Sequence, residues 1–265
     1  MNNYNLRNKV SVITGGAGLL GTQHAEALLE IGSKVVIIDN NSKKIIESKK
    51  YFKKSSKNIF IYHADVTKEK NIKKTLSKIL KKFKRIDVLI NNAAIDYKPK
   101  KDKKKIKNQS FENSKLQDWQ KEIDVGLTGA YICCKIIGSQ ISKKGGVILN
   151  ISSDLSVIAP DQNLYSHLKS VKPASYSAMK HGLIGLTKYL AAYWARKKVR
   201  VNALSPGGVF NFQEKKFINK LKKKIPMRRM ATVKEYKEAI KFLCSDASSY
   251  MTGHNMIIDG GRTIL

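Results

Sequence analysis

Short apolar runs recur along the whole chain, and stretches with the spacing of amphipathic helices lie between them. The runs are rich in Val and Ile, and they lack the alternation of apolar and polar residues that marks a strand with one face in water. We therefore interpret them as strands of a parallel sheet that is covered on both faces. The seven predicted strands are residues 10–13, 35–38, 59–61, 88–90, 147–149, 199–203 and 256–258.

The alternation of strands and helices predicts an α/β fold, a doubly wound, seven-stranded parallel sheet with helices on both faces. A length of 265 residues fits one large domain, so we expect residues 1–265 to form a single Rossmann domain. Three segments lack the rhythm, at about 96–115, 154–174 and 209–232. Ligands of open parallel sheets bind beyond the carboxyl ends of the strands, so these are candidate substrate loops. A solvated insertion is the alternative for the lysine-rich first one.

The composition adds a strong positive charge to this picture. Hydrophobic residues make up 42% of the chain, which is enough for a substantial core and argues against a disordered polycation. There are 51 Lys and Arg residues against 20 Asp and Glu, for a net charge of +31, and only seven of the 51 are Arg. Because nucleic-acid recognition favours Arg, we interpret the excess Lys as coding bias and predict no nucleic-acid partner. Attraction to an acidic partner is the alternative.

The cysteines and the hydropathy pattern bear on the compartment in which the protein is found. The three cysteines form neither a disulfide framework nor a metal-ligand motif, which indicates a reducing compartment and no metal. No apolar run approaches the roughly 18 residues of a membrane span. We therefore expect a cytoplasmic protein with no membrane partner.

The first predicted strand leads into a glycine-rich turn, residues 14–21 (TGGAGLLG), and then into a helical pattern at 22–30. Glycines allow a sharp turn and let backbone N–H groups approach a pyrophosphate at the positive end of a helix. This position between strand and helix is the one that dinucleotide binding requires, and a tight turn without a ligand is the alternative. The candidate cofactor contacts here are Thr14, Gly15, Gly18, Leu20 and Gly21.

Polar residues follow the ends of the next three strands. The second strand ends at Asp39, whose carboxylate can accept hydrogen bonds from both hydroxyls of an adenosine ribose. A carboxylate there repels a 2′-phosphate, so we predict NAD as the cofactor, while Lys43 and Lys44 keep NADP as the alternative. Asn91 is expected to pin neighbouring strands. The further cofactor candidates at these strand ends are Asp65, Val66, Asn92 and Ala93, and an ordinary Asx turn is the alternative for Asp65.

A catalytic constellation is predicted around the fifth strand. That strand delivers Ser153, and a helical pattern downstream holds Tyr176 and Lys180, whose i, i+4 spacing places both on one helix face. The Lys180 ammonium favours the tyrosinate and brings the tyrosine pKa from about 10 toward the working pH. General acid–base catalysis on an alcohol requires such a group.

A second pair with the same spacing, Tyr165 and Lys169, lies closer to Ser153 along the chain. Small residues at 177, 178, 182 and 185 let the Tyr176 helix pack closely, whereas Pro173 interrupts any long helix that begins at Tyr165. We therefore choose Tyr176.

The order of these motifs resembles the short-chain dehydrogenase/reductase family across nearly the whole chain. The matching motifs are the glycine turn, residues 65–66 (DV), 91–94 (NNAA), the serine, the tyrosine with its lysine, and 205–208 (SPGG). By that resemblance, Ser153 hydrogen-bonds the substrate oxygen, Tyr176 exchanges a proton with it, and Lys180 also binds the nicotinamide ribose. The resemblance further implies a homodimer or homotetramer, and cofactor contacts at Tyr176, Lys180, Pro206, Gly207 and Val209.

Three positions depart from the family pattern. Leu19 replaces the middle glycine of the turn, and Asn211 stands where many relatives have a threonine that binds the nicotinamide amide. Gly126 stands where many relatives have an asparagine that helps hold a helix kink and a water in the proton path. We expect Gly126 to keep the main-chain carbonyl and to leave room for another water.

Gly126, the turn at 19–21 and the segment 153–162 (SDLSVIAPDQ) resemble a subgroup of oxidoreductases from surface-glycan pathways, including flagellin modification and legionaminic-acid synthesis. This resemblance implies a sugar phosphate or a nucleotide sugar as the small-molecule substrate. Lysines in the substrate loops would suit such an anionic substrate, and facing water is the alternative for most of them. These lysines are Lys98, Lys100, Lys101, Lys169 and Lys172.

The leading hypothesis is an NAD(H)-dependent oxidoreductase that interconverts a secondary alcohol and a ketone. Among enzymes, the alternative is reduction of 3-oxoacyl groups on acyl carrier protein, whose acidic surface suits a basic partner. A non-catalytic dinucleotide-sensing or nucleic-acid-binding protein is the alternative of a different class, and the intact Ser153, Tyr176 and Lys180 argue against it.

Overall fold

The computed structural model describes residues 3–55, 57–95, 110–168 and 170–265. Its centre is one sheet of seven parallel strands in the order β3-β2-β1-β4-β5-β6-β7, so the predicted doubly wound α/β fold is confirmed. The strands are β1 (Val10–Thr14), β2 (Lys34–Asp39), β3 (Ile59–His63), β4 (Val88–Asn91), β5 (Gly146–Ile151), β6 (Val199–Pro206) and β7 (Asn255–Ile258). The order reverses between β1 and β4, where such sheets open a crevice at their carboxyl edge.

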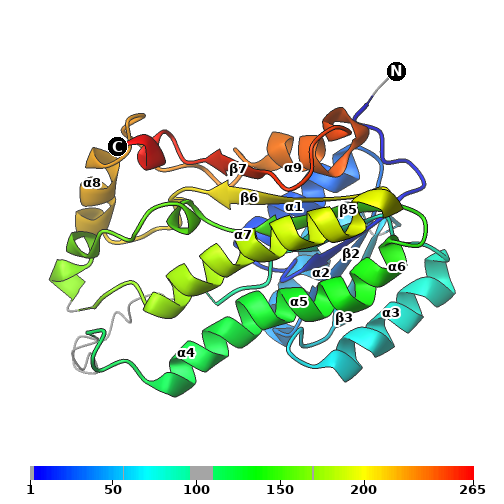
Figure 1. Cartoon of the computed structure of the whole chain (residues 1–265), viewed down its shortest axis with the longest axis horizontal. Coiled ribbons are helices and arrows are strands. Elements are labelled where there is room, and N and C mark those ends of the chain that lie inside the picture. The colour runs from blue at the N-terminus through cyan, green and yellow to red at the C-terminus, as the bar shows by residue number, and fades with distance from the viewer. Residues whose placement is uncertain (1–2, 56, 96–109, 169) are drawn as a thin grey trace.

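Helices cover both faces of the sheet (Figure 1). They are α1 (Leu19–Glu30), α2 (Ser42–Tyr51), α3 (Glu69–Phe83), α4 (Leu116–Ile123), α5 (Gly129–Cys133), α6 (Ser139–Ile141), α7 (Ala174–Trp194), α8 (Lys215–Lys223) and α9 (Lys237–Cys244). Two π-helical turns, Asp124–Thr128 and Cys134–Gly138, join α4, α5 and α6 into one rod, which lies beside α3 and α7 on the same face (Figure 1). Helices α1, α2 and α9 cover the other face. The 3₁₀ turns are Lys53–Ser55, Asp154–Ser156, Gln162–Leu164, Ser166–Leu168, Ala195–Lys197, Asp246–Ser248 and Arg262–Ile264.

Neighbouring residues of each central strand enter opposite cores. Val12 and Val36 pack in the core under α3, α5 and α7, whereas Ile13 and Ile37 pack in the core under α1 and α9. Because both faces are buried, both sets of side chains must be apolar, which explains the unbroken apolar runs in the sequence.

The two helices that matter for the predicted site begin at well-defined points. The helix predicted at 22–30 begins earlier, at Leu19, because Gly18 is its extended N-cap residue and the glycine turn passes directly into the helix. Helix α7 begins at Ala174 with Pro173 as the N-cap residue. Among the helices of the described residues, none is both long enough and apolar enough to cross a membrane.

Candidate active site

The glycine turn between β1 and α1 is packed so closely that side chains do not fit. Gly15 has a φ of +60°, and a Cβ atom there would lie 2.8 Å from the Cα atom of Ala93. A Cβ atom on Gly21 would lie 2.4 Å from the Gly15 carbonyl oxygen. The turn is therefore wedged between the tip of β4 and the first turn of α1, and glycine is required at both positions.

Helix α1 begins directly after the glycine turn, at the carboxyl end of β1, and its N-terminal end is open. Gly18 is the N-cap residue, and no side-chain hydrogen bond from it caps the N–H groups of the first turn. The first turn of α1 contains no acidic residue. The N–H groups at such a helix end carry partial positive charge and favour an anion. Leu19, which replaces the middle glycine, has a side chain that is 46% exposed.

Asp39 holds a buried carboxylate at the tip of β2, beside the glycine turn. Its Oδ2 atom accepts a hydrogen bond from the Ala17 N–H at 3.2 Å, and its Oδ1 atom accepts one from the Asn41 N–H at 2.9 Å. The side chain is 8% exposed. The neighbouring Lys43 and Lys44 are exposed at the start of α2. A carboxylate is thus held in place at the carboxyl end of β2.

Asn92 and Thr14 clamp β4 to the glycine turn. The Thr14 hydroxyl oxygen accepts hydrogen bonds from the N–H groups of Asn92 and Ala93, at 3.1 and 3.2 Å. The Asn92 amide in turn donates to the carbonyl oxygens of Thr14 and Gly15, at 3.1 and 2.9 Å. The Asn92 side chain therefore braces the glycine turn.

Asp65 and Val66, which are predicted to contact the cofactor, follow the end of β3. Asp65 Oδ1 accepts hydrogen bonds from both the N–H and the hydroxyl of Thr67, which is the Asx turn given above as the alternative. Val66 is buried, and its side chain packs against Gly129 of α5, where a Cβ atom would lie 2.8 Å away.

Buried amides connect β4, β5 and α7. The Asn91 amide donates to Asn150 Oδ1 at 2.8 Å, and the Asn150 amide donates to the Thr187 hydroxyl oxygen at 2.8 Å. The prediction that Asn91 pins neighbouring strands is thereby confirmed. The ladder also fixes α7 against the sheet.

Lys180 is tied to the carboxyl end of β5, directly before Ser153. Its ammonium donates to the Ile151 carbonyl oxygen at 2.8 Å, and its own carbonyl oxygen accepts from the Ser152 hydroxyl at 2.8 Å. Tyr176 lies in the first turn of the same helix, and the Lys180 Nζ atom is 5.6 Å from its ring centroid. The structure therefore gathers Tyr176 and Lys180 at the strand end that presents Ser153.

Tyr165 lies on a different element. It follows the 3₁₀ turn Gln162–Leu164, and its ring packs against Phe217 of α8 with centroids 5.4 Å apart. Lys169, its proposed partner, lies outside the described residues.

Of the small residues expected to let the Tyr176 helix pack closely, Gly182 does so, because a Cβ atom there would lie 2.8 Å from the Leu127 side chain. Gly185 does not, since nothing lies within 4 Å of its added Cβ atom. The choice of Tyr176 stays a prediction.

Sequence reasoning missed an ion pair beside Ser153. The Ser153 hydroxyl donates to Asp154 Oδ1 at 2.8 Å and accepts from the Leu155 N–H at 3.2 Å. Arg262 donates to Asp154 Oδ2 at 2.6 Å, and the two side chains are only 9% and 4% exposed. The C-terminal residues thus hold the carboxylate that orients the Ser153 hydroxyl. No local pattern links Arg262 to Asp154, so this contact was outside the reach of motif spacing.

Gly126 departs from expectation. The prediction that it leaves room for another water is wrong, because a Cβ atom at Gly126 would lie 1.7 Å from the Met179 sulfur. The thioether of α7 fills that space. The helix nevertheless keeps a π-helical turn at Asp124–Thr128, so the irregularity of the rod does not depend on an asparagine here.

The segment after β6 closes tightly against β7. A Cβ atom on Gly207 would lie 2.6 Å from the Asp259 Cα atom, and the Gly207 N–H donates to the Ile258 carbonyl oxygen at 2.9 Å. Pro206 ends β6, and Val209 forms a bridge with Ala231. The Asn211 N–H donates to the Gln213 side chain at 2.8 Å, which orders the loop that holds the three predicted contacts.

Of the lysines predicted to attract an anionic substrate, the structure describes Lys172. Lys98, Lys100, Lys101 and Lys169 lie outside the described residues. Lys172 is only 8% exposed, and its Nζ atom lies 3.7 Å from the centroid of the Tyr176 ring. It is therefore not a lysine that simply faces water.

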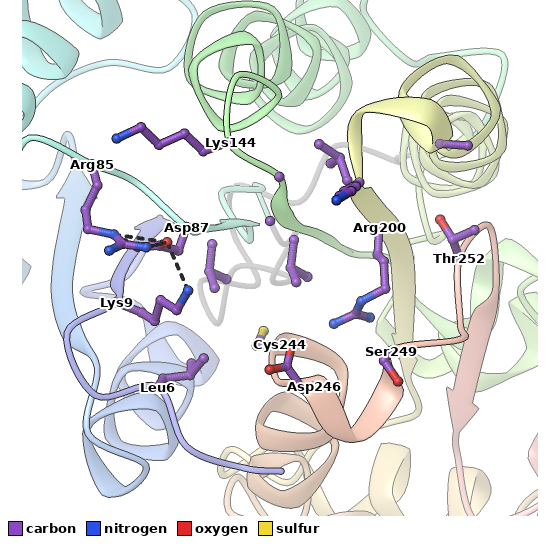
Figure 2. Close-up of a pocket in the computed structure, with 17 residues that line it drawn as sticks. Leu6, Lys9, Arg85, Asp87, Lys144, Arg200, Cys244, Asp246, Ser249 and Thr252 are labelled. Atoms are coloured by element: carbon purple, nitrogen blue, oxygen red, sulfur yellow. Dashed lines mark hydrogen bonds and ion pairs between the residues drawn. The ribbon is translucent and has the colours of Figure 1, made fainter.

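A depression of about 540 Å³ lies at the opposite edge of the sheet, where the strands begin (Figure 2). Three of the cations that line it are engaged within the protein: Arg85 and Lys9 pair with Asp87, and Arg200 donates to the Ser245 carbonyl oxygen at 2.8 Å. Burial lowers the pKa of Arg200. None of the predicted site residues lines this depression, so it is separate from the candidate site.

The cysteines and histidines offer no competing chemistry in the described part of the chain. Burial raises the pKa of the Cys133 thiol and raises those of Cys134 and Cys244 to about 12, so the three thiols stay protonated and unreactive at neutral pH. Among the described residues, no cluster of three or more potential metal ligands is found.

Comparisons with known proteins cover nearly the whole chain. Residues 16–263 match the sequence profile of a family described as enoyl-(acyl carrier protein) reductase. An NAD-dependent glycerol dehydrogenase from Listeria innocua serovar 6a is 33% identical over 267 residues, which span 98% of this chain and 96% of the relative. A 3-oxoacyl-[acyl-carrier-protein] reductase from Buchnera aphidicola subsp. Baizongia pistaciae is 35% identical over 261 residues, which span 96% of each. The crystal structure of a short-chain dehydrogenase from Leptospira borgpetersenii serovar Hardjo-bovis with bound NAD⁺ has a TM-score of 0.83 at 30% identity, covering 98% of this chain and 94% of that one.

Proposed function

The chain belongs to the short-chain dehydrogenase/reductase family and is an oxidoreductase of the alcohol–ketone type, and on that premise we propose that it uses NAD(H) to interconvert a secondary alcohol and a ketone of a sugar-like substrate. The observation that best supports this proposal is the gathering of Tyr176 and Lys180 at the end of β5, beside Ser153. The glycerol dehydrogenase relative supports a polyhydroxylated substrate.

The residues at the carboxyl ends of β1 and β2 fit a dinucleotide. Gly15 and Gly21 keep side chains out of the turn, and the open end of α1 supplies N–H groups for a pyrophosphate. The buried Asp39 carboxylate would accept hydrogen bonds from ribose hydroxyls and oppose a 2′-phosphate, which favours NAD over NADP. When bound, the nicotinamide ring accepts a hydride from an alcohol carbon or delivers one to a ketone carbon.

Three side chains would bind the substrate oxygen or transfer its proton. Tyr176 takes the alcohol proton during oxidation and returns it during reduction. Lys180, held on the Ile151 carbonyl, places an ammonium near that phenol and within reach of a nicotinamide ribose. Ser153 donates its hydroxyl proton to Asp154 in this structure, so the hydroxyl would have to turn toward the substrate to donate to its oxygen.

We further propose that segments 154–174 and 209–232 form one wall of the substrate site. The two segments are in contact. Leu164 packs with Leu221 and Met230. The Lys220 ammonium donates to the Asn163 carbonyl oxygen at 2.8 Å. The finer proposal for the substrate is a sugar phosphate or a nucleotide sugar of a surface-glycan pathway, supported by the sequence likeness at 153–162.

The test is a screen of polyols, sugar phosphates and nucleotide sugars with NAD⁺, in which NADH formation is followed by absorbance. We expect Tyr176→Phe to lower kcat by at least about 100-fold, because the proton acceptor is lost. Tyr165→Phe is the matched control and should keep kcat within a few-fold of the wild type. An inactive Tyr165→Phe variant beside an active Tyr176→Phe variant would overturn the assignment.

Reduction of 3-oxoacyl groups on acyl carrier protein is the second candidate. It is favoured by the 35% identical relative of that name, and the net charge of +31 suits an acidic carrier. Oxidation of NADPH with acetoacetyl thioesters, without activity on polyols or sugars, would establish it instead.

We also propose a cytoplasmic homo-oligomer. Tyr189 and Tyr193 of α7 stack with centroids 5.9 Å apart, and their side chains are 64% and 61% exposed. Exposed aromatic pairs of this kind are typical of protein interfaces. Three unpaired, buried cysteines agree with a reducing compartment. Light scattering of the purified protein measures the oligomeric state directly.

A further inference from the structure

Lys172 is a buried lysine that lies on the ring of Tyr176. It is 8% exposed, and its Nζ atom is 3.7 Å from the ring centroid. A position this close to the centroid requires the ammonium to lie over the ring face, where the aromatic quadrupole attracts a cation.

The backbone of Lys172 is held, so the contact does not depend on a freely rotating surface chain. The Lys172 N–H donates to Gln162 Oε1 at 2.8 Å, and the Gln162 amide donates back to the Lys172 carbonyl oxygen at 3.2 Å. The next residue, Pro173, has a restricted φ angle and is the N-cap residue of α7. Lys172 is thus fixed relative to the helix turn that holds Tyr176.

Two ammonium groups therefore flank one phenol. Lys180 approaches from α7 with its Nζ atom 5.6 Å from the ring centroid, and Lys172 approaches from the preceding segment. Each ammonium attracts a tyrosinate more strongly than a neutral tyrosine, because ionisation places a full negative charge on the phenolate.

Among the described residues, three charged or titratable groups next to this turn have partners of their own. Glu122 of α4 accepts a hydrogen bond from the Ser175 hydroxyl at 2.6 Å. Asp161 pairs with Lys224 at 3.1 Å, and the His181 ring nitrogen lies 3.0 Å from the Ser177 carbonyl oxygen. Among the contacts that the described residues show, the charges over the Tyr176 ring are both positive.

We propose that Lys172 is a positioning residue that acts through Tyr176, stabilising its phenolate together with Lys180. During alcohol oxidation the substrate O–H proton would then move to a phenolate oxygen that is populated closer to neutral pH, while the hydride would leave the carbon that bears this oxygen for the NAD⁺ of the proposed function. The consequence for turnover rests on the function proposed above, whereas the ionisation of Tyr176 does not.

The test is a spectrophotometric titration of tyrosine ionisation, in which the Tyr176→Phe curve is subtracted from that of the intact protein to isolate Tyr176. Lys172→Met, measured against Lys172→Met/Tyr176→Phe, should raise the Tyr176 pKa by about one unit, because a buried cation is lost. Lys172→Arg should keep it within a few tenths of a unit. Lys188→Met removes the same charge from an exposed position of α7 and is the matched control, expected to leave the pKa unchanged.

A second readout is the pH dependence of alcohol oxidation, whose acid limb should move upward by the same amount in Lys172→Met. Lys172→Gln replaces the methionine variant if thermal unfolding shows that the latter does not fold. An unchanged Tyr176 titration in the folded variant overturns the inference, even if turnover remains dependent on Tyr176. A shifted titration without turnover on any substrate supports the inference and rejects the proposed function.

Discussion

A single carboxylate sets the charge at the tip of β2. Asp39 accepts hydrogen bonds from the Ala17 and Asn41 N–H groups, so its position is fixed before any ligand binds. A preorganised charge discriminates between ligands without the loss of side-chain entropy that a mobile residue would incur on binding. Placing a like charge beside it costs several kcal/mol, which is the physical basis for predicting NAD over NADP.

At the residue scale we predict that Asp39→Ser shifts cofactor preference. The ratio of kcat/KM for NADH to that for NADPH should fall by at least about tenfold, because repulsion of a 2′-phosphate is removed. Asp65→Ser is the control, since any contact of Asp65 with adenine affects both cofactors equally. A wild-type enzyme that prefers NADPH would contradict the role given to Asp39.

At the element scale, the rod formed by α4, α5 and α6 packs unusually closely against α7. Gly126 lies in the π-helical turn of the rod, and Met179 of α7 occupies the space that a side chain at Gly126 would need. The Met179 thioether thus fills the space that glycine leaves at position 126. Close packing here also holds the helix that presents Tyr176 and Lys180.

We predict that Gly126→Ala lowers the free energy of unfolding by about 1–3 kcal/mol through overpacking. Gly185→Ala in α7 is the control, because it makes the same change in a helix where nothing lies within 4 Å of the added Cβ atom. That change should stabilise by up to about 1 kcal/mol. Urea unfolding of both variants provides the measurement.

Met179→Ala completes a double-mutant cycle with Gly126→Ala. The combined loss should be smaller than the sum of the two single losses, because the alanine methyl enters the space that the thioether leaves. Additive losses would show that the two sites are independent.

At the scale of the whole molecule, a buried histidine links stability to pH. His24 of α1 is fully buried, and within the described part of the chain neither ring nitrogen has a hydrogen-bond partner. Burial lowers its pKa from 6.5 to about 3. The unfolded chain therefore binds a proton between these values that the folded chain does not bind, so stability falls as the pH drops through that window.

We predict that the free energy of unfolding decreases by about 1.6 kcal/mol between pH 6.5 and pH 5 through His24 alone, and that His24→Leu removes this part. The hydrogen bond with Arg229 lowers the pKa of Glu235 from 4.5 to about 2, so the stabilisation from this pair is lost only below pH 4.5. The chosen pH interval lies above that range. Denaturant unfolding of both proteins at the two pH values gives the comparison. Equal pH slopes for wild type and variant would refute the assignment.

The sequence by itself determined the seven strands, their parallel pairing and the polar residues at their tips. These features follow from local rules, since a strand buried on both faces must be apolar throughout, and a motif directly after a strand must lie at its carboxyl end. The same rules predicted that Asn91 pins neighbouring strands and that Pro173 interrupts any long helix that begins at Tyr165. In the structure Pro173 is the N-cap residue of α7.

Only the tertiary structure decided which distant side chains meet. Met179 at Gly126, Arg262 on Asp154 and Lys172 over Tyr176 depend on how helices and tails pack, and none has a periodic or motif signature. The expected space for a water at Gly126 was wrong for this reason. Spacing along a chain predicts neighbours on one element, whereas contacts between elements depend on the packed core as a whole.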